Sequence, residues 1–359
     1  MKILFVIRDM VIGGAGKQLA LTANALSQKG HKVFIYSYFG GENKHLLESN
    51  VTYIAQEPIP NSKLKEYLFA IPHIRKQMKA IKPDIAISWR CNAGCFTVLA
   101  ALGLPLKTIF SERSDPYTET SLALKISAFF CNFSNAGVFQ TEAVQNYYRR
   151  LTKRSTVIHN PFDPKIGNHE IVPIQNRKKE IVHIARMMIV QKRQDVMLMA
   201  FKIFSQKHPD YILSFYGDGL DFDQVRNHAK ALQIEEKVIF HGDVVGAANK
   251  IGNAQMLVLT SDYEGIPNVV MEAFAMGVPV VSTDCSPGGA RVLINDGENG
   301  FIVPRGDSEA IAKKMDVIAE DEEIFKRFIL NSKEKLLKFK PNTIFDKWNN
   351  YLLEISSSK

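Results

Sequence analysis

Paired cysteines, long apolar runs and an excess of acidic residues are all lacking from this chain of 359 residues. No apolar run approaches the roughly 20 residues that a membrane-spanning helix needs, and the N-terminal KILFVI is too short for a secretory signal. The cysteines form no C-x-x-C pair and have no histidine at zinc spacing, so we expect reduced thiols and no structural metal. These cysteines are Cys91, Cys95, Cys131 and Cys285. We therefore expect a protein of the cytoplasm.

The formal net charge of +8 is unevenly placed along the chain. Residues 1–163 carry 20 Lys and Arg against 11 Asp and Glu, whereas residues 164–359 carry 25 against 26. The N-terminal half therefore predicts an anionic partner, which could be nucleic acid, an anionic membrane surface or a pyrophosphate-linked substrate. The length allows two domains of ordinary size, and 46% hydrophobic with 23% charged residues is typical of a globular protein.

Short apolar runs alternate with helical patterns along the whole chain, which predicts parallel sheets covered on both faces. Two prolines near Asn160 and a polar stretch up to Glu180 predict a linker between two α/β domains. Helices are expected at 308–318, 323–339 and 344–355. The predicted strands span 2–7, 31–38, 51–55, 84–89, 107–111, 136–140, 156–159, 181–185, 211–216, 238–240, 256–259 and 279–284.

The stretch from Thr260 to Val281, TSDYEGIPNVVMEAFAMGVPVV, is the most informative part of the sequence. It follows a buried strand, and Gly265 and Pro267 interrupt the chain before a helix begins. We expect the backbone N–H groups of 268–270 to be free in the first helical turn, where the helix dipole favours a phosphate. Glu264 and Glu272 frame that turn, and carboxylates are suited to accept hydrogen bonds from sugar hydroxyl groups.

Two cations follow the first strand of the second domain. Arg186 comes directly after the strand, and Lys192 lies at the start of the next helix. They could pair with Asp195 or Glu180, or they could bind an anion at the carboxyl edge of the sheet. We favour the second interpretation, because ligands of open parallel sheets bind outside the carboxyl ends of the strands.

The Glu-x7-Glu pair between a strand and an apolar helix resembles the signature of retaining nucleotide-sugar glycosyltransferases of the family 4 type. The resemblance implies an α/β fold of two facing Rossmann-like domains (GT-B type), with a C-terminal helix that crosses back to the first domain. It implies an acceptor domain at 1–164 with 342–359, and a donor domain at 165–341. The sequence is similar to bacterial transferases that extend lipid-linked oligosaccharides or surface polysaccharides.

The resemblance also assigns roles to residues of this sequence. The expected catalytic residues are Glu264, Arg186 and Lys192. A basic helix at 63–82, which Pro72 is expected to kink, implies an acceptor site for a lipid pyrophosphate at Lys63, Lys65, Arg75, Lys76 and Lys79. The donor nucleotide sugar, expected to be UDP-linked, would contact Gly13, Gly14, Arg113, Val244, Gly265, Ile266, Pro267, Asn268, Val269 and Glu272.

The sequence departs from the family pattern at two positions of the first domain. Gly16 stands where many members have a glutamate, and Arg113 stands where many have a histidine. Arginine stays protonated and cannot act as a base, although it can bind a hydroxyl or phosphate group. In the CSPGGAR segment, Gly288 and Gly289 could approach the donor.

Asp221-Phe222-Asp223 matches the D-x-D metal motif of another glycosyltransferase fold, but it immediately precedes a helical pattern. Carboxylates at such a position satisfy free N–H groups, so we interpret it as a helix cap and expect no metal and no cofactor.

The predicted reaction is transfer of a hexose or N-acetylhexosamine with retention of configuration. The protein is expected to be peripheral at the inner face of the bacterial cell membrane. One alternative is a nucleotide-sugar epimerase of the same architecture, with Asp115 and Glu142 as acid and base. Another is a basic protein that binds nucleic acid or membrane through a patch at Arg149, Arg150, Lys153 and Arg154. The second alternative leaves the Glu-x7-Glu stretch unexplained.

Overall fold

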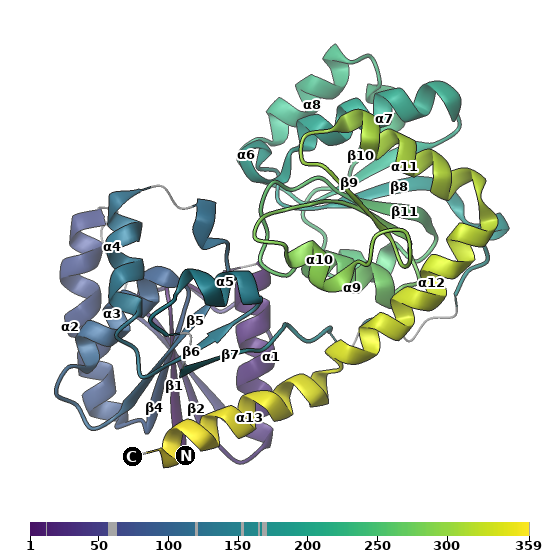
Figure 1. Cartoon of the computed structure of the whole chain (residues 1–359). Coiled ribbons are helices and arrows are strands. Elements are labelled where there is room, and N and C mark those ends of the chain that lie inside the picture. The colour runs from purple at the N-terminus through teal and green to yellow at the C-terminus, as the bar shows by residue number, and fades with distance from the viewer. Residues whose placement is uncertain are drawn as a thin grey trace. The chain divides into compact units, whose positions relative to one another are not determined.

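The computed structural model describes residues 1–11, 13–56, 63–118, 121–151, 154–163, 166 and 171–358, and only the backbone of 63–67. The chain divides into two compact units (Figure 1). Unit 1 comprises Met1–Pro161 and Asn342–Lys359, and unit 2 comprises Phe162–Pro341. Among the described helices, none has the length and apolar character that crossing a bilayer requires.

Unit 1 is built around a parallel sheet with the strand order β3-β2-β1-β4-β5-β6-β7. Its strands are β1 (Lys2–Ile7), β2 (Lys32–Ser37), β3 (Val51–Ala55), β4 (Ile85–Trp89), β5 (Lys107–Glu112), β6 (Ala136–Phe139) and β7 (Ser155–Val157). Its helices are α1 (Gly14–Gln28), α2 (Lys63–Ile81), α3 (Cys91–Ala101), η1 (Pro116–Thr118), α4 (Leu122–Cys131), α5 (Glu142–Tyr147) and α13 (Pro341–Ser357).

Alternate residues of β1 send their side chains to opposite faces of this sheet, as the pleat requires. Ile3 and Phe5 pack in a core with α1 and α13, whereas Leu4 and Val6 pack in another with α2 and α3. The sheet is thus buried on both sides, which explains why its strands are almost continuously apolar.

Unit 2 repeats this plan with the parallel strand order β10-β9-β8-β11-β12-β13. Its strands are β8 (Lys178–Ile184), β9 (Ile212–Tyr216), β10 (Val238–Phe240), β11 (Ala254–Leu259), β12 (Val280–Thr283) and β13 (Phe301–Val303). Its α-helices are α6 (Ile189–Lys192), α7 (Gln194–Lys207), α8 (Phe222–Ala231), α9 (Asn268–Ala275), α10 (Gly289–Leu293), α11 (Ser308–Glu320) and α12 (Glu322–Leu336); the 3₁₀ turns are η3 (Ile174–Asn176), η4 (Glu235–Lys237), η5 (Ala247–Lys250) and η6 (Leu337–Phe339).

In both sheets the first strand lies centrally and the strand order reverses beside it, which is the doubly wound Rossmann-like topology. The predicted fold class is therefore confirmed. The reversal lies between β1 and β4 in unit 1, and between β8 and β11 in unit 2. A crevice at this point is where open α/β sheets bind their ligands.

The structure differs from the prediction at β8, at β13 and at Pro341. Strand β8 begins at Lys178, before the predicted start at Ile181, because its first three residues are charged and give no apolar signal. Strand β13, which is only three residues long, was not predicted. Pro341, expected only to end a helix, also begins α13, where its fixed φ suits the first helical position.

Helix α13 is held on unit 1 by its apolar face. Ile344, Trp348 and Leu352 are buried in the same core as β1, which confirms that the C-terminal helix belongs to the first domain. The Trp348 ring stacks on Trp89 at 6.0 Å between centroids. The Arg113 guanidinium lies 4.4 Å from the Trp89 ring centroid and 5.3 Å from that of Trp348.

Trp348→Ala should destabilise unit 1 by about 3–5 kcal/mol, since it removes a fully buried indole and the stacking on Trp89. Because the only two tryptophans both lie in unit 1, the fluorescence of Trp89 reports the unfolding of that unit in urea. Trp348→Phe should recover much of the loss. Equal midpoints for wild type and Trp348→Ala would mean that α13 contributes little to the core.

Candidate functional site

The loops beside the strand reversal of unit 2 carry the three residues expected to be catalytic. Arg186 lies in the connection from β8 to α6, Lys192 ends α6, and Glu264 lies between β11 and α9. Because β8 and β11 are neighbouring parallel strands, both connections leave from the same edge of the sheet. The resemblance predicted that these residues share one crevice, and the pairing of β8 with β11 explains why two connections far apart along the chain lie at one sheet edge.

Lys192 and Glu264 form an ion pair. The Nζ atom of Lys192 donates to Oε1 of Glu264 at 2.5 Å, and the Ser261 hydroxyl donates to the same oxygen at 2.8 Å. The two side chains are 16% and 14% exposed, so each charge needs this compensation. Lys192 therefore pairs with Glu264, and not with the Asp195 or Glu180 considered from the sequence.

Hydrogen bonds fasten the connection that holds Lys192 to the connection that holds Glu264. The N–H of Asp262 donates to the Gln191 carbonyl at 2.8 Å, and the Gln191 amide donates back to the Tyr263 carbonyl at 3.0 Å. The Thr260 hydroxyl donates to the Lys192 carbonyl at 2.7 Å. These hydrogen bonds between the two connections thus hold the ion pair in place.

Arg193 adds a charged clamp between the same segments. Its φ of 50° lies in the left-handed region and separates α6 from α7. Its guanidinium binds Asp195 at 2.9 Å and Asp262 at 3.2 Å. Side-chain hydrogen bonding to Asp195 is the main reason why the Arg193 pKa is raised. Sequence reasoning missed this residue, because its partner Asp262 comes from another connection.

The N-terminus of α9 is supported by the loop that follows β12. The N–H of Glu264 donates to the Ser286 carbonyl at 2.8 Å, and a Cβ atom on Gly289 would lie only 1.5 Å from the Gly265 carbonyl oxygen. Gly289 is therefore required by close backbone packing. Ile266, expected to contact the donor, is almost wholly buried among apolar side chains.

The expectation of three free N–H groups at α9 needs a correction. The N–H of Val270 donates to the Pro267 carbonyl at 3.1 Å, because the first turn tightens and closes a bond. Within the described residues, the Val269 N–H has no acceptor. Glu272 is half-buried in the middle of α9, where its carbonyl accepts from Met276.

Arg186 is exposed and lies against a glycine-rich connection after β9. A Cβ atom on Gly217 would lie 2.1 Å from the Ala185 carbonyl oxygen, and one on Gly219 would lie 2.3 Å from that of Met187. Only glycine lets these two connections approach so closely. The Arg186 carbonyl accepts a hydrogen bond from the Gln194 amide at 2.8 Å, which fixes the backbone that presents this cation.

The segment expected to meet the nucleotide base lies after β10. His241 stacks on Tyr216 with ring centroids 4.2 Å apart, and the Gly217 N–H donates to the Gly242 carbonyl at 2.7 Å. Val244 is half-buried and packs against the core. The segment therefore adjoins the connection after β9.

The prediction that the Asp221 side chain caps α8 is wrong, because this side chain binds the start of a different helix. Its carboxylate accepts from the N–H of Ile189 at 2.7 Å, at the start of α6, and makes no side-chain cap on α8. The tertiary fold offered this N–H from a neighbouring connection. Asp223 lies in the first turn of α8, as expected for an acidic residue there.

His183 is a buried ring beneath this site. It lies on β8, its Nδ1 atom bonds the Val258 carbonyl at 2.9 Å, and its Nε2 atom has no partner in the described part of the chain. Burial, with a smaller contribution from the charge of Lys192, lowers the His183 pKa to about 4. The ring is therefore neutral, with the proton on Nδ1.

In unit 1, the expected donor glycines begin α1. Gly13 is its N-cap, and the N–H of Lys17 closes the first helical bond to the Gly13 carbonyl at 3.1 Å. The N–H groups of the first turn that come before Lys17 have no acceptor within the helix, as at any helix start. At Gly16, a Cβ atom would lie 2.5 Å from the His45 ring, which explains why a larger residue is absent there.

Arg113 is buried rather than presented at the sheet edge. Its Nε atom donates to Ser111 Oγ at 2.9 Å, and Nη1 donates to the Ile158 carbonyl and to Asn160 Oδ1, both at 3.4 Å. Burial lowers the Arg113 pKa to about 9. Its Nη2 atom is buried without a hydrogen-bond partner in the described part of the chain, and a donor contact by Arg113 stays a prediction.

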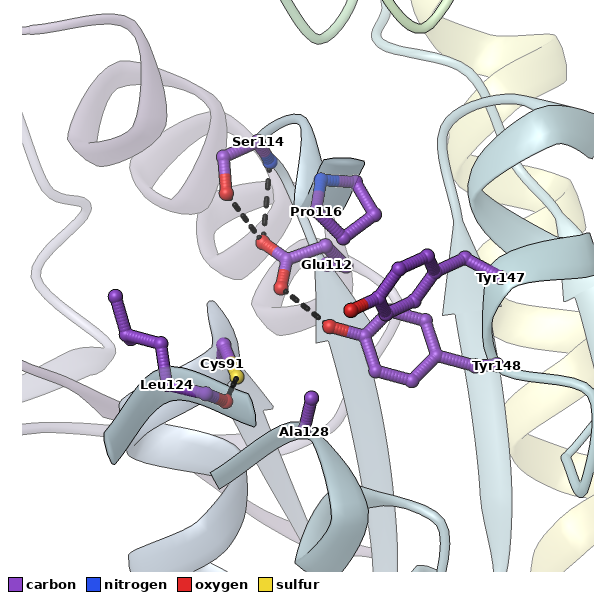
Figure 2. A pocket seen from close by; sticks show the side chains of 8 residues that line it. All are labelled: Cys91, Glu112, Ser114, Pro116, Leu124, Ala128, Tyr147 and Tyr148. Atoms are coloured by element: carbon purple, nitrogen blue, oxygen red, sulfur yellow. Dashed lines mark hydrogen bonds between the residues drawn. The ribbon is translucent and has the colours of Figure 1, made fainter. Parts of the chain in front are cut away.

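A small cavity in unit 1 surrounds the buried Glu112 carboxylate (Figure 2). Oε1 accepts from Ser114 through both its N–H and its hydroxyl, and Oε2 accepts from the Tyr148 hydroxyl at 3.2 Å. The cavity volume of about 10 Å³ suits at most one water. Burial raises the pKa of Tyr148. This network fixes the turn after β5 and has no room for a sugar.

The predicted acceptor residues lie along α2. Arg75 donates to the Ala100 and Leu102 carbonyls at 2.7 Å each and so caps the end of α3. Lys76 and Lys79 are exposed. The side chains of Lys63 and Lys65 lie outside the described part, and the helix continues through Pro72.

The residues of the two alternatives lie in unit 1. Asp115 is buried and accepts from the N–H of Tyr117 at 2.9 Å, whereas Glu142 is exposed at the start of α5. Arg149, Arg150 and Arg154 are exposed, and Lys153 lies outside the described residues. Asp115 thus serves a turn, which argues against its use as a catalytic acid or base.

The fold defines a doubly wound α/β protein whose second sheet carries Lys192, Glu264 and the N-terminus of α9 at its carboxyl edge. Residues 12–166 match the family model "Glycosyltransferase Family 4", and residues 165–335 match "Glycosyl transferases group 1". Together these matches leave only the two ends of the chain uncovered. The chain is therefore a glycosyltransferase of the family 4 type, with GT-B architecture.

Relatives and solved structures agree over the whole length. The chain is 29% identical over 374 residues, covering all of both sequences, to the Campylobacter jejuni GalNAc-alpha-(1->4)-GalNAc-alpha-(1->3)-diNAcBac-PP-undecaprenol alpha-1,4-N-acetyl-D-galactosaminyltransferase. It is 26% identical to an uncharacterized glycosyltransferase of Haemophilus influenzae, with 98% and 99% coverage. Anabaena HepE in complex with UDP-glucose has a TM-score of 0.83 at 20% identity, with 99% and 100% coverage.

The unfolding free energy of unit 2 should fall in mild acid because of His183. Its folded pKa of about 4 lies below the 6.5 of a free ring, so the unfolded state binds more protons between these values. Stability from this source is complete above pH 6.5 and is lost as the pH falls toward 4.

His183→Asn keeps a donor for the Val258 carbonyl but does not titrate in this range. Between pH 7.5 and 5, wild type should lose about 2 kcal/mol more than this variant, measured by urea unfolding followed by circular dichroism. Equal losses would show that His183 is protonated in the folded protein.

Proposed function

We propose that the protein transfers a hexose or N-acetylhexosamine from a UDP-sugar to a lipid-linked oligosaccharide or surface polysaccharide, with retention of anomeric configuration. The observation that carries this proposal is the Lys192–Glu264 pair beside the N-terminus of α9, at the strand reversal of unit 2. A cation, a carboxylate and a helix start are the groups needed for a diphosphate joined to a sugar.

Each of these groups would bind a different part of the donor. The diphosphate would attract Lys192 and Arg186, and the N–H groups at the start of α9 would add the helix dipole. Glu264 would then accept hydrogen bonds from sugar hydroxyls in place of its bond to Lys192. Glu272, inside α9, would accept from the ribose.

In the reaction, the bond between the anomeric carbon and the diphosphate oxygen breaks, and a bond to an acceptor hydroxyl forms on the same face. The acceptor proton passes to the departing diphosphate. Negative charge grows on that leaving group, so Lys192 and Arg186 stabilise the transition state more than the bound substrate. This scheme uses no metal and no cofactor.

Acceptor binding would fall to unit 1, where the positive charge is concentrated. The exposed Lys76 and Lys79 of α2 are suited to a lipid pyrophosphate and to an anionic membrane. The names of the relatives support such an acceptor, because the Campylobacter transferase acts on an undecaprenol diphosphate carrier. Peripheral association with the inner face of the membrane follows from this choice.

The proposal can be tested with purified protein and a panel of nucleotide sugars. A donor at about 100 times its dissociation constant should add about 2.7 kcal/mol of stability and raise the melting temperature. With undecaprenol-diphosphate oligosaccharides as acceptors, the product should keep the donor's anomeric configuration by NMR, and EDTA should not stop transfer. An inverted product would reject the mechanism, and a free epimerised nucleotide sugar would favour the epimerase.

Lys192→Ala should lower kcat by about 10²–10³-fold, because it removes a cation from the departing diphosphate. Lys192→Arg keeps the charge and should lose less. Steady-state kinetics with the donor found above would separate kcat from KM. A higher KM with unchanged kcat would assign Lys192 to ground-state binding alone.

Glu272→Ala should raise the dissociation constant of the donor by about tenfold or more and leave kcat nearly unchanged, since a ribose contact is equal in the ground and transition states. Glu272→Gln retains an acceptor oxygen and serves as the matched control. Calorimetric titration with UDP measures the loss directly, and an unaltered affinity for UDP would contradict the ribose assignment.

A further inference from the structure

Helix α4 presents its large apolar side chains to solvent. Its buried residues are the small Ser127, Ala128 and Cys131. Leu122 is 73% exposed, Ile126 47% and Phe129 48%, and Phe133 just beyond the helix is 55% exposed. An amphipathic helix of a globular protein normally has the opposite arrangement.

Packing against α3 explains why the inner face is small. A Cβ atom on Gly94 of α3 would lie 2.5 Å from Cys131 Sγ, so the two helices approach closely and leave no room for larger side chains. The core does not need the outer residues. Their spacing of four, three and four positions nevertheless keeps them on one helical face.

We call Leu122, Ile126, Phe129 and Phe133 the α4 face. Its aromatic end is a cluster, because Phe129 lies 5.3 Å from Phe133 and 5.7 Å from Phe130 between ring centroids. All four side chains of this face are about half exposed or more. Contiguous exposed apolar side chains of this kind mark contact sites for proteins or membranes.

Cations border the α4 face. Lys125 is exposed on α4 itself, and the Arg150 guanidinium lies 5.5 Å from the Phe129 ring centroid. Leu124 and Ala128 of α4 line one side of the Glu112 cavity, opposite Tyr147 and Tyr148, so the segment after α5 adjoins α4 (Figure 2). Residues 121–135 and 143–157 contain no Asp or Glu.

We propose that the α4 face docks on an anionic lipid bilayer. Phenylalanine and aliphatic side chains would enter the boundary between headgroups and acyl chains, while Lys125, Arg149 and Arg150 contact lipid phosphates. Apolar side chains bordered by cations match such a surface. A second copy of the chain fits less well, because a symmetric contact would bring the cations of both copies together.

This inference rests on the proposed function in one respect, which is the role of the α4 face in holding the enzyme where a lipid-linked acceptor resides. Membrane binding through the α4 face would differ from binding through the basic surface of α2 in the interaction that drives it. Attraction between exposed charges is screened by salt, whereas apolar insertion is not. Binding through the α4 face should therefore retain a component at high salt.

The test uses the full chain and sedimentation with vesicles of phosphatidylcholine containing 30% phosphatidylglycerol, in 0.1 and 0.5 M NaCl. Wild type should bind in both. Ile126→Gln with Phe129→Gln should lower the partition coefficient by about 10–100-fold at both salt concentrations. Lys125→Gln with Arg150→Gln should weaken binding mainly at 0.1 M.

Leu330→Gln on α12 is the matched control, since Leu330 is 71% exposed in unit 2, and circular dichroism checks that each variant is folded. Vesicle binding needs neither donor nor acceptor, so it can succeed or fail independently of the glycosyl transfer. Wild-type affinity in the Ile126/Phe129 variant would overturn the proposal. A wild-type dimer that this variant converts to a monomer, without vesicle binding by either, would assign the face to self-association.

Discussion

The ion pair between Lys192 and Glu264 is the interaction on which the arrangement of unit 2 depends. Both side chains are mostly buried, so removing either partner would leave an uncompensated charge. The pair is held in place by hydrogen bonds between the connections that follow β8 and β11, one between two backbone groups and two from side chains to backbone carbonyls. Arg193 and Asp262 join the same connections a second time. These contacts keep a cation and a carboxylate at a fixed spacing beside the start of α9, where both can exchange their mutual bond for bonds to a ligand.

Glycine decides how closely the surrounding connections approach. Gly289 lies against the Gly265 carbonyl, and Gly217 lies against that of Ala185, at distances that no Cβ atom permits. The edge of the sheet is therefore lined by backbone at these places, and the charged side chains reach it from α6 and from the connection before α9. In the proposed reaction, such preorganisation would reduce the reorganisation that a charged leaving group requires.

Unit 1 has the same doubly wound topology as unit 2, but its charged residues are placed differently. Its sequence places cations on α2 and after α5, and it buries Glu112 and Arg113 near the end of β5, where the Arg113 N–H donates to Oε1 of Glu112. Helix α13 completes this unit through Trp348, so the two ends of the chain belong to one core. The large side chains that the close α3–α4 contact keeps out of the core lie on the outer face of α4. Positive charge and apolar surface thus occur together on this unit.

The sequence by itself determined the fold class, most strands and the loop residues at the sheet edges, because apolar periodicity and glycine or proline breaks are local signals. It also placed Glu264, Arg186 and Lys192 on the correct connections. Only the tertiary structure decided which of these residues meet. Asp221 bonds a helix other than its own, Lys192 pairs with Glu264 rather than Asp195, and Arg113 is enclosed by tryptophans from β4 and α13. The exposure of the α4 face was likewise hidden, since a pattern of apolar residues shows a face but not the direction in which it points. Each of these outcomes depends on contacts between segments distant along the chain, and such contacts are fixed by packing rather than by local preference.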